Sequence, residues 1–304
     1  MIGRVVEIAT DGVHLSVDRG FMVVSQDHER IGQVALDDVA ALVIHGHGAT
    51  WSANLTARLA DRGVPIVICG SNHAPVALVW PIEGHYEQGR RMQAQAEASR
   101  PLRKRLWKEL VRSKILAQAD AIKAFGTRSG ALRDLAGRVR SGDPENIEGT
   151  AARRYWPLMM GEDFRRDRKS GGANAMLNYG YMVLRAATAR SILAAGLHPS
   201  LSVHHESRGN ALRLADDLME PFRPYVDGTV KNLLETAGGE LDRDAKAAIV
   251  KVTALDLEGP KGASPLQTCL DRLATSLALI YMGDRKALEL PGPALALFNQ
   301  FNKP

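Results

Sequence analysis

The chain has 304 residues, of which 45% are hydrophobic and 24% charged, a composition typical of a folded globular protein with room for two domains. No stretch approaches the about 18 consecutive apolar residues of a membrane span, and the N-terminus lacks the layout of a secretory signal, so we expect a cytoplasmic protein with no membrane partner. The cysteines Cys69 and Cys269 form no CxxC pair, which argues against a cysteine-based zinc site, and the net charge of +5 permits an anionic partner without requiring one.

The N-terminal part of the chain consists of short β-branched runs separated by turn residues. Because strands this close in sequence are usually joined by hairpins, we expect a mostly antiparallel sheet. One helix interrupts the strands, over Ala53–Asp61, with Ser52 as its N-cap. The predicted strands are Arg4–Ala9, Val13–Val17, Phe21–Ser25, Ile31–Leu36, Ala41–Ile44, Val64–Cys69 and Pro75–Trp80.

From Glu87 onward the hydrophobic periodicity is helical. The sequence therefore predicts an α+β fold, with a small β-rich N-terminal domain over residues 1–85 and a larger all-α C-terminal domain over residues 95–304. A polar segment, His85–Arg91, is the expected linker. The predicted helices are Gln88–Ser99, Pro101–Phe125, Gly130–Arg140, Pro144–Met160, Asn174–Ala195, Asn210–Leu234, Arg243–Leu257 and Ser264–Met282.

The most informative stretch carries two adjacent histidines, His204 and His205, followed by Asp216, Asp217 and Glu220 on a predicted helix. Helical spacing places the three carboxylates on one face, where like charges need a compensating cation, either a nearby arginine or a bound metal. Carboxylates with an imidazole and no cysteine suit Mg²⁺ or Mn²⁺. The alternative is a solvated acidic face beside an ordinary polar histidine pair.

A second carboxylate source lies upstream, in residues 143–156. Asp143 or Ser141 is placed to cap a helix that has Pro144 in its first turn, with Glu148 one turn later. An ordinary acidic first turn, favoured by the helix dipole, is the alternative interpretation.

Two basic stretches offer surfaces for phosphate groups. Arg100, Lys104 and Lys108 recur every four residues and form a stripe along one predicted helix. The segment 165–169, Arg-Arg-Asp-Arg-Lys, precedes a glycine-rich loop. Such residues give salt-dependent, sequence-tolerant DNA affinity, although a solvated helical face explains the first stretch equally well.

Four blocks of the chain, in this order, resemble the CRISPR-associated integrase family, the Cas-one proteins of spacer acquisition. The blocks are Glu148-Gly149-x-Ala151-Ala152-x-x-Tyr155-Trp156, Asn174-Ala175-x-Leu177-Asn178-Tyr179-Gly180-Tyr181, Gly196-Leu197-x-Pro199-x-Leu201-x-x-x-His205 and Asp217-Leu218-Met219-Glu220-x-Phe222-Arg223-Pro224. One departure is visible, because His205-Glu206-Ser207-Arg208-Gly209-Asn210 replaces the Ser-Asp-Arg-Pro-Gly run that follows the histidine in many relatives.

The resemblance implies that the chain inserts short DNA into a CRISPR array by metal-dependent transesterification. It implies that Glu148, His205 and Glu220 are the catalytic residues and bind Mg²⁺ or Mn²⁺, with Asp217 as an assisting ligand. The match falls on His205 rather than His204, because His205 is the histidine fifteen residues before Glu220.

The resemblance also implies partners. These are double-stranded DNA (prespacer and CRISPR repeat), a second copy of the chain bound largely through the β domain, and a dimer of the small Cas-two protein. The compact length is most similar to the branch found in type II systems, which implies association with the type II effector nuclease.

Two other functions stay open at this point. One is a stand-alone structure-specific nuclease that acts on branched DNA or repair intermediates. The other is a non-catalytic scaffold that binds DNA ends. The presence of Glu148, His205 and Glu220 together argues against the scaffold, which has no physical need for all three.

Overall fold

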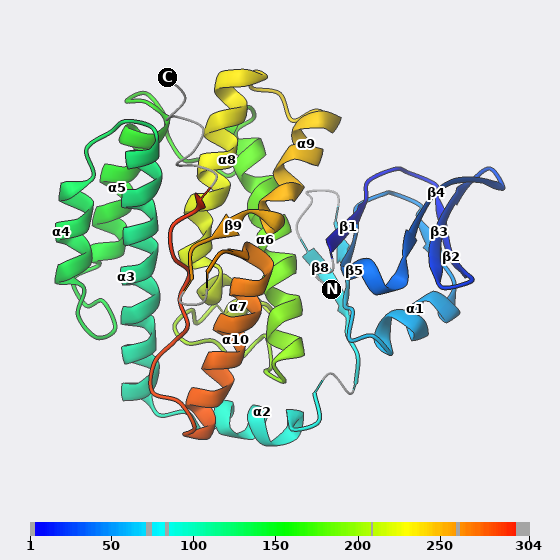
Figure 1. Cartoon of the computed structure of the whole chain (residues 1–304), viewed down its shortest axis with the longest axis horizontal. Helices are drawn as coiled ribbons and strands as arrows, with labels where there is room; N and C mark the ends of the chain where they lie inside the picture. Colours follow the sequence, from blue (N-terminus) through cyan, green and yellow to red (C-terminus); the bar gives the residue numbers. More distant parts are fainter. Residues whose placement is uncertain (1–3, 71–74, 83–84, 208, 260–261, 296–304) are drawn as a thin grey trace.

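The computed structural model describes residues 4–70, 75–82, 85–207, 209–259 and 262–295. A β-rich N-terminal region lies beside a larger helical C-terminal region (Figure 1), so the predicted α+β fold class is confirmed. Within these residues, no helix is long and apolar enough to cross a membrane.

The β-rich region is built from two four-stranded sheets. In spatial order, the first sheet contains β1 (Arg4–Ile8), β5 (Val39–Ile44), β7 (Ile66–Cys69) and β8 (Pro75–Val79). The second contains β4 (Glu29–Ala35), β3 (Phe21–Gln26), β2 (His14–Asp18) and β6 (Thr50–Trp51).

The expectation of a mostly antiparallel sheet is right for the β2–β3–β4 meander but wrong for the first sheet. There β5 pairs in parallel with both β1 and β7, and only β8 is antiparallel. The reason lies in the connections: helix α1 (Ala53–Ala60) lies in the crossover between β5 and β7, and the whole meander separates β1 from β5. Crossovers of this length return a strand in the parallel direction.

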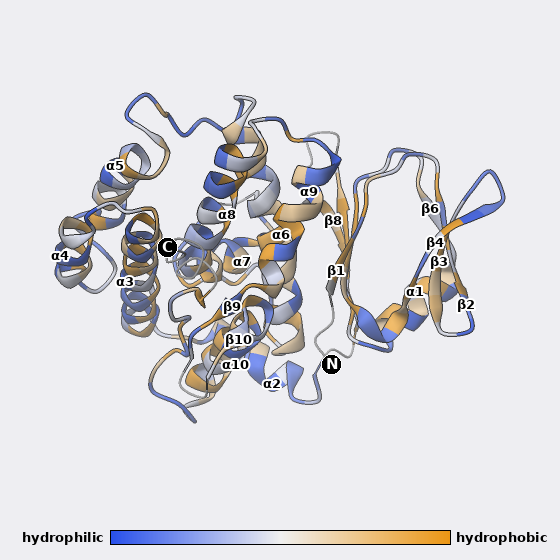
Figure 2. Cartoon of the chain, turned by 45° about the horizontal axis from the view of Figure 1, so that its top comes forward, coloured by the Kyte–Doolittle hydropathy of each residue, from blue (hydrophilic) through white to orange (hydrophobic). Residues whose placement is uncertain are grey.

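Strand β5 is buried on both faces, which explains its uninterrupted apolar sequence. Ala41 and Val43 belong to the core of the helical region, whereas Leu42 and Ile44 belong to a second core between the two sheets and α1. Figure 2 shows hydrophobic residues along the strands of this sheet, next to α6. The first sheet therefore has one core on each side.

The helical region is arranged around α3 (Arg100–Ala124) and α6 (Ala173–Ala194). Its largest fully enclosed side chains include Trp107, Tyr155 and Phe222. The other helices are α2 (Gln88–Ala96), α4 (Gly130–Arg138), α5 (Ile147–Met160), α7 (Arg213–Leu218), α8 (Arg223–Thr236), α9 (Arg243–Val250) and α10 (Leu266–Met282).

Two predicted helices are not continuous in the structure. The predicted helix Asn210–Leu234 is divided into α7, a 3₁₀ turn over Glu220–Phe222, and α8, because Pro221 and Pro224 lack the backbone N–H groups that a continuous helix needs. The predicted helix Arg243–Leu257 ends at Val250. It is followed by a 3₁₀ turn (Lys251–Ala254) and strand β9 (Asp256–Leu257), which pairs with β10 (Ser264–Pro265).

The predicted linker His85–Arg91 is partly helical, because α2 begins at Gln88. Arg91 is buried and donates a hydrogen bond to the carbonyl of Ala195. One turn later, the Gln95 amide donates to the carbonyls of His198 and Leu201. Helix α2 therefore braces the loop that leads to His205.

Candidate functional site

Glu148 lies in the first turn of α5, which begins at Ile147, three residues later than predicted. Asp143, one of the two predicted caps, accepts hydrogen bonds from the backbone N–H groups of Ile147 and Glu148. Asn146 occupies the N-cap position in the left-handed conformation and accepts from the Gly149 N–H. These bonds satisfy the free N–H groups of the helix start and fix the position of Glu148.

His205 lies in the loop before α7, and Asp217 holds it there. The Asp217 side chain is fully buried, and its oxygens accept the backbone N–H groups of Val203 (2.7 Å), His204 (2.9 Å) and His205 (3.3 Å). The same carboxylate lies 2.5 Å from Nδ1 of His205. The hydrogen bond with Asp217 raises the pKa of His205 against the opposing effect of burial. It leaves Nε2 as the ring nitrogen available to a ligand.

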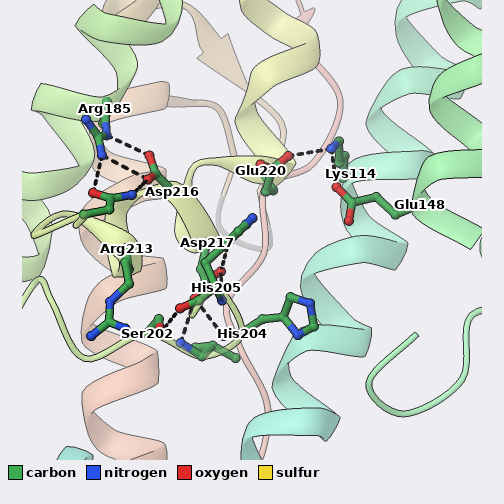
Figure 3. Close-up of polar contacts among 12 residues, drawn as sticks. Lys114, Glu148, Arg185, Ser202, His204, His205, Arg213, Asp216, Asp217 and Glu220 are labelled. Atoms are coloured by element: carbon green, nitrogen blue, oxygen red, sulfur yellow. Dashed lines mark hydrogen bonds and ion pairs between the residues drawn. The ribbon is translucent and has the colours of Figure 1, made fainter. Parts of the chain in front are cut away.

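Glu148 and Glu220 meet at a lysine that comes from α3 (Figure 3). The Lys114 ammonium lies 2.5 Å from Oε1 of Glu148 and 2.6 Å from Oε2 of Glu220. The other oxygen of Glu220 lies 3.0 Å from Nε of Arg223. Two acidic side chains from different elements thus converge on one cation.

The charges at this point are mutually stabilised. Burial opposes the charged form of Lys114, but Glu220 and Glu148 outweigh it and raise the pKa of the ammonium. Burial likewise opposes the charged form of Glu220, yet Arg223 and Lys114 hold the pKa of this carboxyl below its usual value. Lys114 and Glu220 are therefore both charged at neutral pH.

The three carboxylates predicted to lie on one helical face, those of Asp216, Asp217 and Glu220, point in different directions. Asp216 points away from Glu220 and pairs with Arg185 of α6, at 2.7 Å, while Asp217 turns to the His205 loop. The division of the predicted helix at Pro221 separates these directions. The expected compensating cation is present for both carboxylates: Arg185 pairs with Asp216, and Lys114 and Arg223 pair with the buried Glu220.

The predicted metal ligands fit a hard divalent ion by their chemistry. Glu148 and Glu220 each place a carboxylate oxygen against one cation, the Lys114 ammonium, and carboxylate oxygens are also the donors that Mg²⁺ and Mn²⁺ prefer. Oε2 of Glu220 is buried and makes this ion pair without a well-aligned hydrogen bond. His205 is close enough to lower the pKa of Glu220. In the described residues, no three His, Cys, Asp or Glu side chains are arranged as a group that could hold a metal ion.

Sequence reasoning did not identify Lys114 as a member of the site. Its signal is periodicity: Leu110, Lys114 and Gln118 recur every four residues, and the first and last of these are buried. A lysine on a buried helical face needs an acidic partner.

An aromatic contact beside the site was also missed. The ring of His204 stacks on buried Trp107, with centroids 4.3 Å apart and an interplanar angle of 6°. The His205 ring meets the same indole edge-on at 5.6 Å. The two adjacent histidines thus pack on one tryptophan of α3, a contact that fixes the loop in addition to the bonds from Asp217.

Two basic clefts reach the site, and His205 lines both. The α3 cleft, about 460 Å³, is lined by Arg100, Arg103 and Lys104 together with Glu148 and His204. The predicted stripe contributes Arg100 and Lys104 but not Lys108.

The second cleft, the α6 cleft, has a volume of about 800 Å³. Arg166, Arg168 and Lys169 from the second basic stretch line it, as do Arg185 and Arg223. Arg166 is tied to the side chains of Asn174 and Asn178, whereas the side chains of Arg168 and Lys169 are exposed. Arg208 of the divergent loop lies outside the described residues.

Comparison with known proteins places this arrangement in a family. The model of the family described as CRISPR associated protein Cas1 matches residues 6–244. The CRISPR-associated endonuclease Cas1 of Neisseria meningitidis serogroup C (strain 8013) is 34% identical over 286 residues, which cover 92% of this chain and 93% of the relative.

Solved structures share the fold at lower identity. A casposase bound to integration product superposes with a TM-score of 0.77 at 20% identity, covering 94% of this chain and 92% of that chain. A chain of a Cas6-RT-Cas1–Cas2 complex gives a TM-score of 0.73 at 18% identity, covering 94% of this chain and 36% of that chain. The matched family model and the similarity across nearly the whole length lead to one conclusion: the chain belongs to the CRISPR-associated Cas1 family.

Proposed function

We propose that this protein is a divalent-metal-dependent DNA integrase and endonuclease of CRISPR adaptation, which inserts spacers into a CRISPR array. The observation that carries the proposal is the convergence of Glu148 and Glu220 on one cation beside His205. The names of its relatives, an endonuclease and an integration-product complex, point to the same chemistry. Assignment to the type II branch, with its effector nuclease, stays a prediction.

Glu148, His205 and Glu220 would hold Mg²⁺ or Mn²⁺. A bound ion of this kind acts as a Lewis acid that stabilises charge on the transferring phosphoryl group. Asp217 orients His205 through Nδ1 and the loop N–H groups, so we assign it a positioning role beside its expected role as an assisting ligand.

The reaction exchanges one phosphodiester bond for another. The 3′-hydroxyl oxygen of the spacer attacks a phosphorus of the repeat, and the bond to the original 3′-oxygen breaks. The proton lost by the attacking hydroxyl is balanced by the proton that the released 3′-oxygen takes up. With water as the nucleophile, the same site performs hydrolysis, which accounts for endonuclease activity.

The two basic clefts supply DNA binding on either side of His205. Their arginine and lysine side chains neutralise phosphates without reading bases, so sequence preference comes from DNA shape and from partner proteins. The expected partners are double-stranded prespacer and repeat DNA, a second copy of this chain, and a Cas2 dimer. Similarity to a chain of a Cas1–Cas2 complex supports the last of these.

The test is strand transfer of a short 3′-hydroxyl duplex into a supercoiled plasmid that carries the repeat, with Cas2 and Mg²⁺ or Mn²⁺ added. We expect metal-dependent joining by the native chain and none by His205→Ala or Glu220→Ala, while DNA binding persists. Glu145→Gln is the matched control, because Glu145 is exposed two residues before α5 and pairs with Arg140 outside the site.

The outcomes separate the alternatives. Joining that survives both substitutions contradicts the ligand assignment. Cleavage without joining, independent of Cas2, supports the stand-alone nuclease instead. DNA binding with neither cleavage nor joining supports the scaffold.

A further inference from the structure

The site contains a cation that belongs to the chain itself. The Lys114 side chain is only 13% exposed, and its ammonium lies within hydrogen-bonding distance of one oxygen from Glu148 and one from Glu220. The two oxygens surround the nitrogen from separate elements, α5 and the turn before α8. The ammonium therefore bridges the two carboxylates, as a metal ion bridges its ligands.

The buried charges balance without any added ion. Glu148 and Glu220 supply two negative charges, and Lys114 and Arg223 supply two positive ones. A divalent ion placed between the carboxylates would add two further positive charges within a few ångströms of the ammonium. Like charges at that distance repel strongly in a partly buried site. The ion and the ammonium therefore exclude one another.

Of the two basic residues, Lys114 is the one able to move. Arg223 is fixed by its contact with the second oxygen of Glu220 and by the Tyr181 ring, which lies 4.7 Å from its guanidinium. Lys114 carries a compact charge on a flexible four-carbon chain, and the ion pairs of its ammonium with described residues are those with Glu148 and Glu220, the two acidic residues proposed to hold the metal.

We propose that Lys114 is a built-in counter-cation, which holds Glu148 and Glu220 together in the metal-free protein and which a divalent metal displaces from between them. The proposal rests on the metal site of the proposed function. In this proposal Lys114 positions the two acidic ligands. The measured metal affinity then reflects how much more favourably the two carboxylates interact with the metal ion than with the Lys114 ammonium.

Removal of the ammonium should increase metal affinity. In Lys114→Met the metal no longer competes with an internal charge, so we expect Mn²⁺ to bind the full-length protein at least about fivefold more tightly than it binds the native chain, the lower end of typical couplings between two sites. The free Mn²⁺ signal in electron paramagnetic resonance measures this directly, without an activity assay. Lys123→Met, which removes an exposed charge from the same helix α3, is the matched control and should bind Mn²⁺ as the native chain does.

Stability without metal gives an independent measurement. In EDTA, Lys114→Met leaves Glu148 without its cation and Glu220 with Arg223 alone, so its urea midpoint should fall, and added Mn²⁺ should raise that midpoint more than it raises the native one. If Lys114→Met does not fold in EDTA, the double variant with Glu148→Gln removes one negative charge and should fold. Its Mn²⁺ affinity is then compared with that of Glu148→Gln alone. A double variant that is equally unfolded would show that Lys114 acts through packing and would overturn the proposal.

Failure of this proposal and failure of the proposed function are distinguishable. If Glu220→Gln abolishes Mn²⁺ binding but Lys114→Met leaves the affinity unchanged or weaker, the counter-cation role is wrong and the metal site stands. If the native chain binds no Mn²⁺ that depends on Glu220, both are wrong.

Discussion

Nδ1 of His205 lies 2.5 Å from Oδ1 of Asp217, a carboxylate that also accepts backbone N–H groups from the histidine loop. One buried side chain thereby fixes both the path of the loop and the orientation of the ring. The relationship predicts that Asp217 controls the function of His205 even if it never touches an ion itself.

Asp217→Asn keeps the shape of the side chain but replaces one acceptor oxygen with an N–H₂ donor, which faces groups that already donate. We expect strand transfer to fall about 10- to 100-fold, as for other groups that orient metal ligands. The free energy of unfolding should fall by about 1–3 kcal/mol, because a buried N–H loses its partner. Single-turnover joining and urea unfolding measure the two effects. Asp244→Asn, at an exposed position in α9, is the control, and an equal loss of joining there would refute the role of Asp217.

DNA affinity should depend on Arg168 and Lys169, whose exposed side chains line the α6 cleft. Replacing both with glutamine should weaken binding to all DNA sequences equally. It should also reduce the slope of log affinity against log salt concentration by about 1–2, since each phosphate contact contributes about 0.9. Fluorescence anisotropy at several salt concentrations measures the slope. Lys286→Gln, exposed and outside both clefts, should leave it unchanged.

Gly180 marks a close approach of α6 to its neighbours. A Cβ at this position would lie 2.4 Å from Cγ1 of Val226 in α8 and 3.1 Å from Cγ2 of Ile249 in α9. We expect Gly180→Ala to lower the free energy of unfolding by about 1–3 kcal/mol through overpacking, although alanine favours helix by about 1 kcal/mol.

The matched control is Gly137→Ala in α4, where a Cβ meets no atom within 4 Å. This change should stabilise the protein by about 0.5–1 kcal/mol. Adding Val226→Ala to Gly180→Ala should recover part of the loss. Equal effects at the two glycines in urea unfolding would contradict the packing explanation.

Stability should depend on pH through Glu7, which lies between the first sheet and α6. Burial raises the pKa of its carboxyl to about 7, with Lys246 opposing the shift. His45 lies 3.3 Å away, and the Tyr179 hydroxyl donates to the other oxygen. Because the folded-state pKa exceeds the unfolded value, Glu7 contributes most stability below about pH 4.5, and this contribution is lost as pH rises toward 7.

Glu7→Gln removes this titration. Relative to the native chain, the variant should therefore gain about 1–3 kcal/mol of unfolding free energy between pH 5 and pH 8. Urea unfolding at several pH values measures the difference. Asp61→Asn, on the exposed end of α1, should track the native chain at every pH. A difference between Glu7→Gln and the native chain that does not change with pH would refute the assignment.

Some features of this protein could be predicted from its sequence and others could not. The order of most strands and helices was predictable because apolar periodicity is local, whereas the assignment of Glu148, His205 and Glu220 as site residues comes from the family resemblance and stays a prediction. The parallel pairing of β1 with β5 was not predictable in this way, because it depends on where a distant strand lies. The division of the helix at Pro221 was missed because the periodicity continues across it. The burial of Lys114 has a local signal in the periodicity of its helix, but its partners Glu148 and Glu220 come from two other elements and no local pattern identifies them.

Strand β5 contributes alternate side chains to two cores, and the helical core includes Val5, Val43 and Val67 of its sheet. A fragment that begins after residue 95 would lose these strands and expose the apolar face of α6 that they cover. Such a fragment should aggregate when expressed alone, because its exposed apolar face would associate with the apolar faces of other copies. We therefore expect the helical region to require the β-rich region in order to stay folded, so mutational studies of the candidate site call for the complete protein.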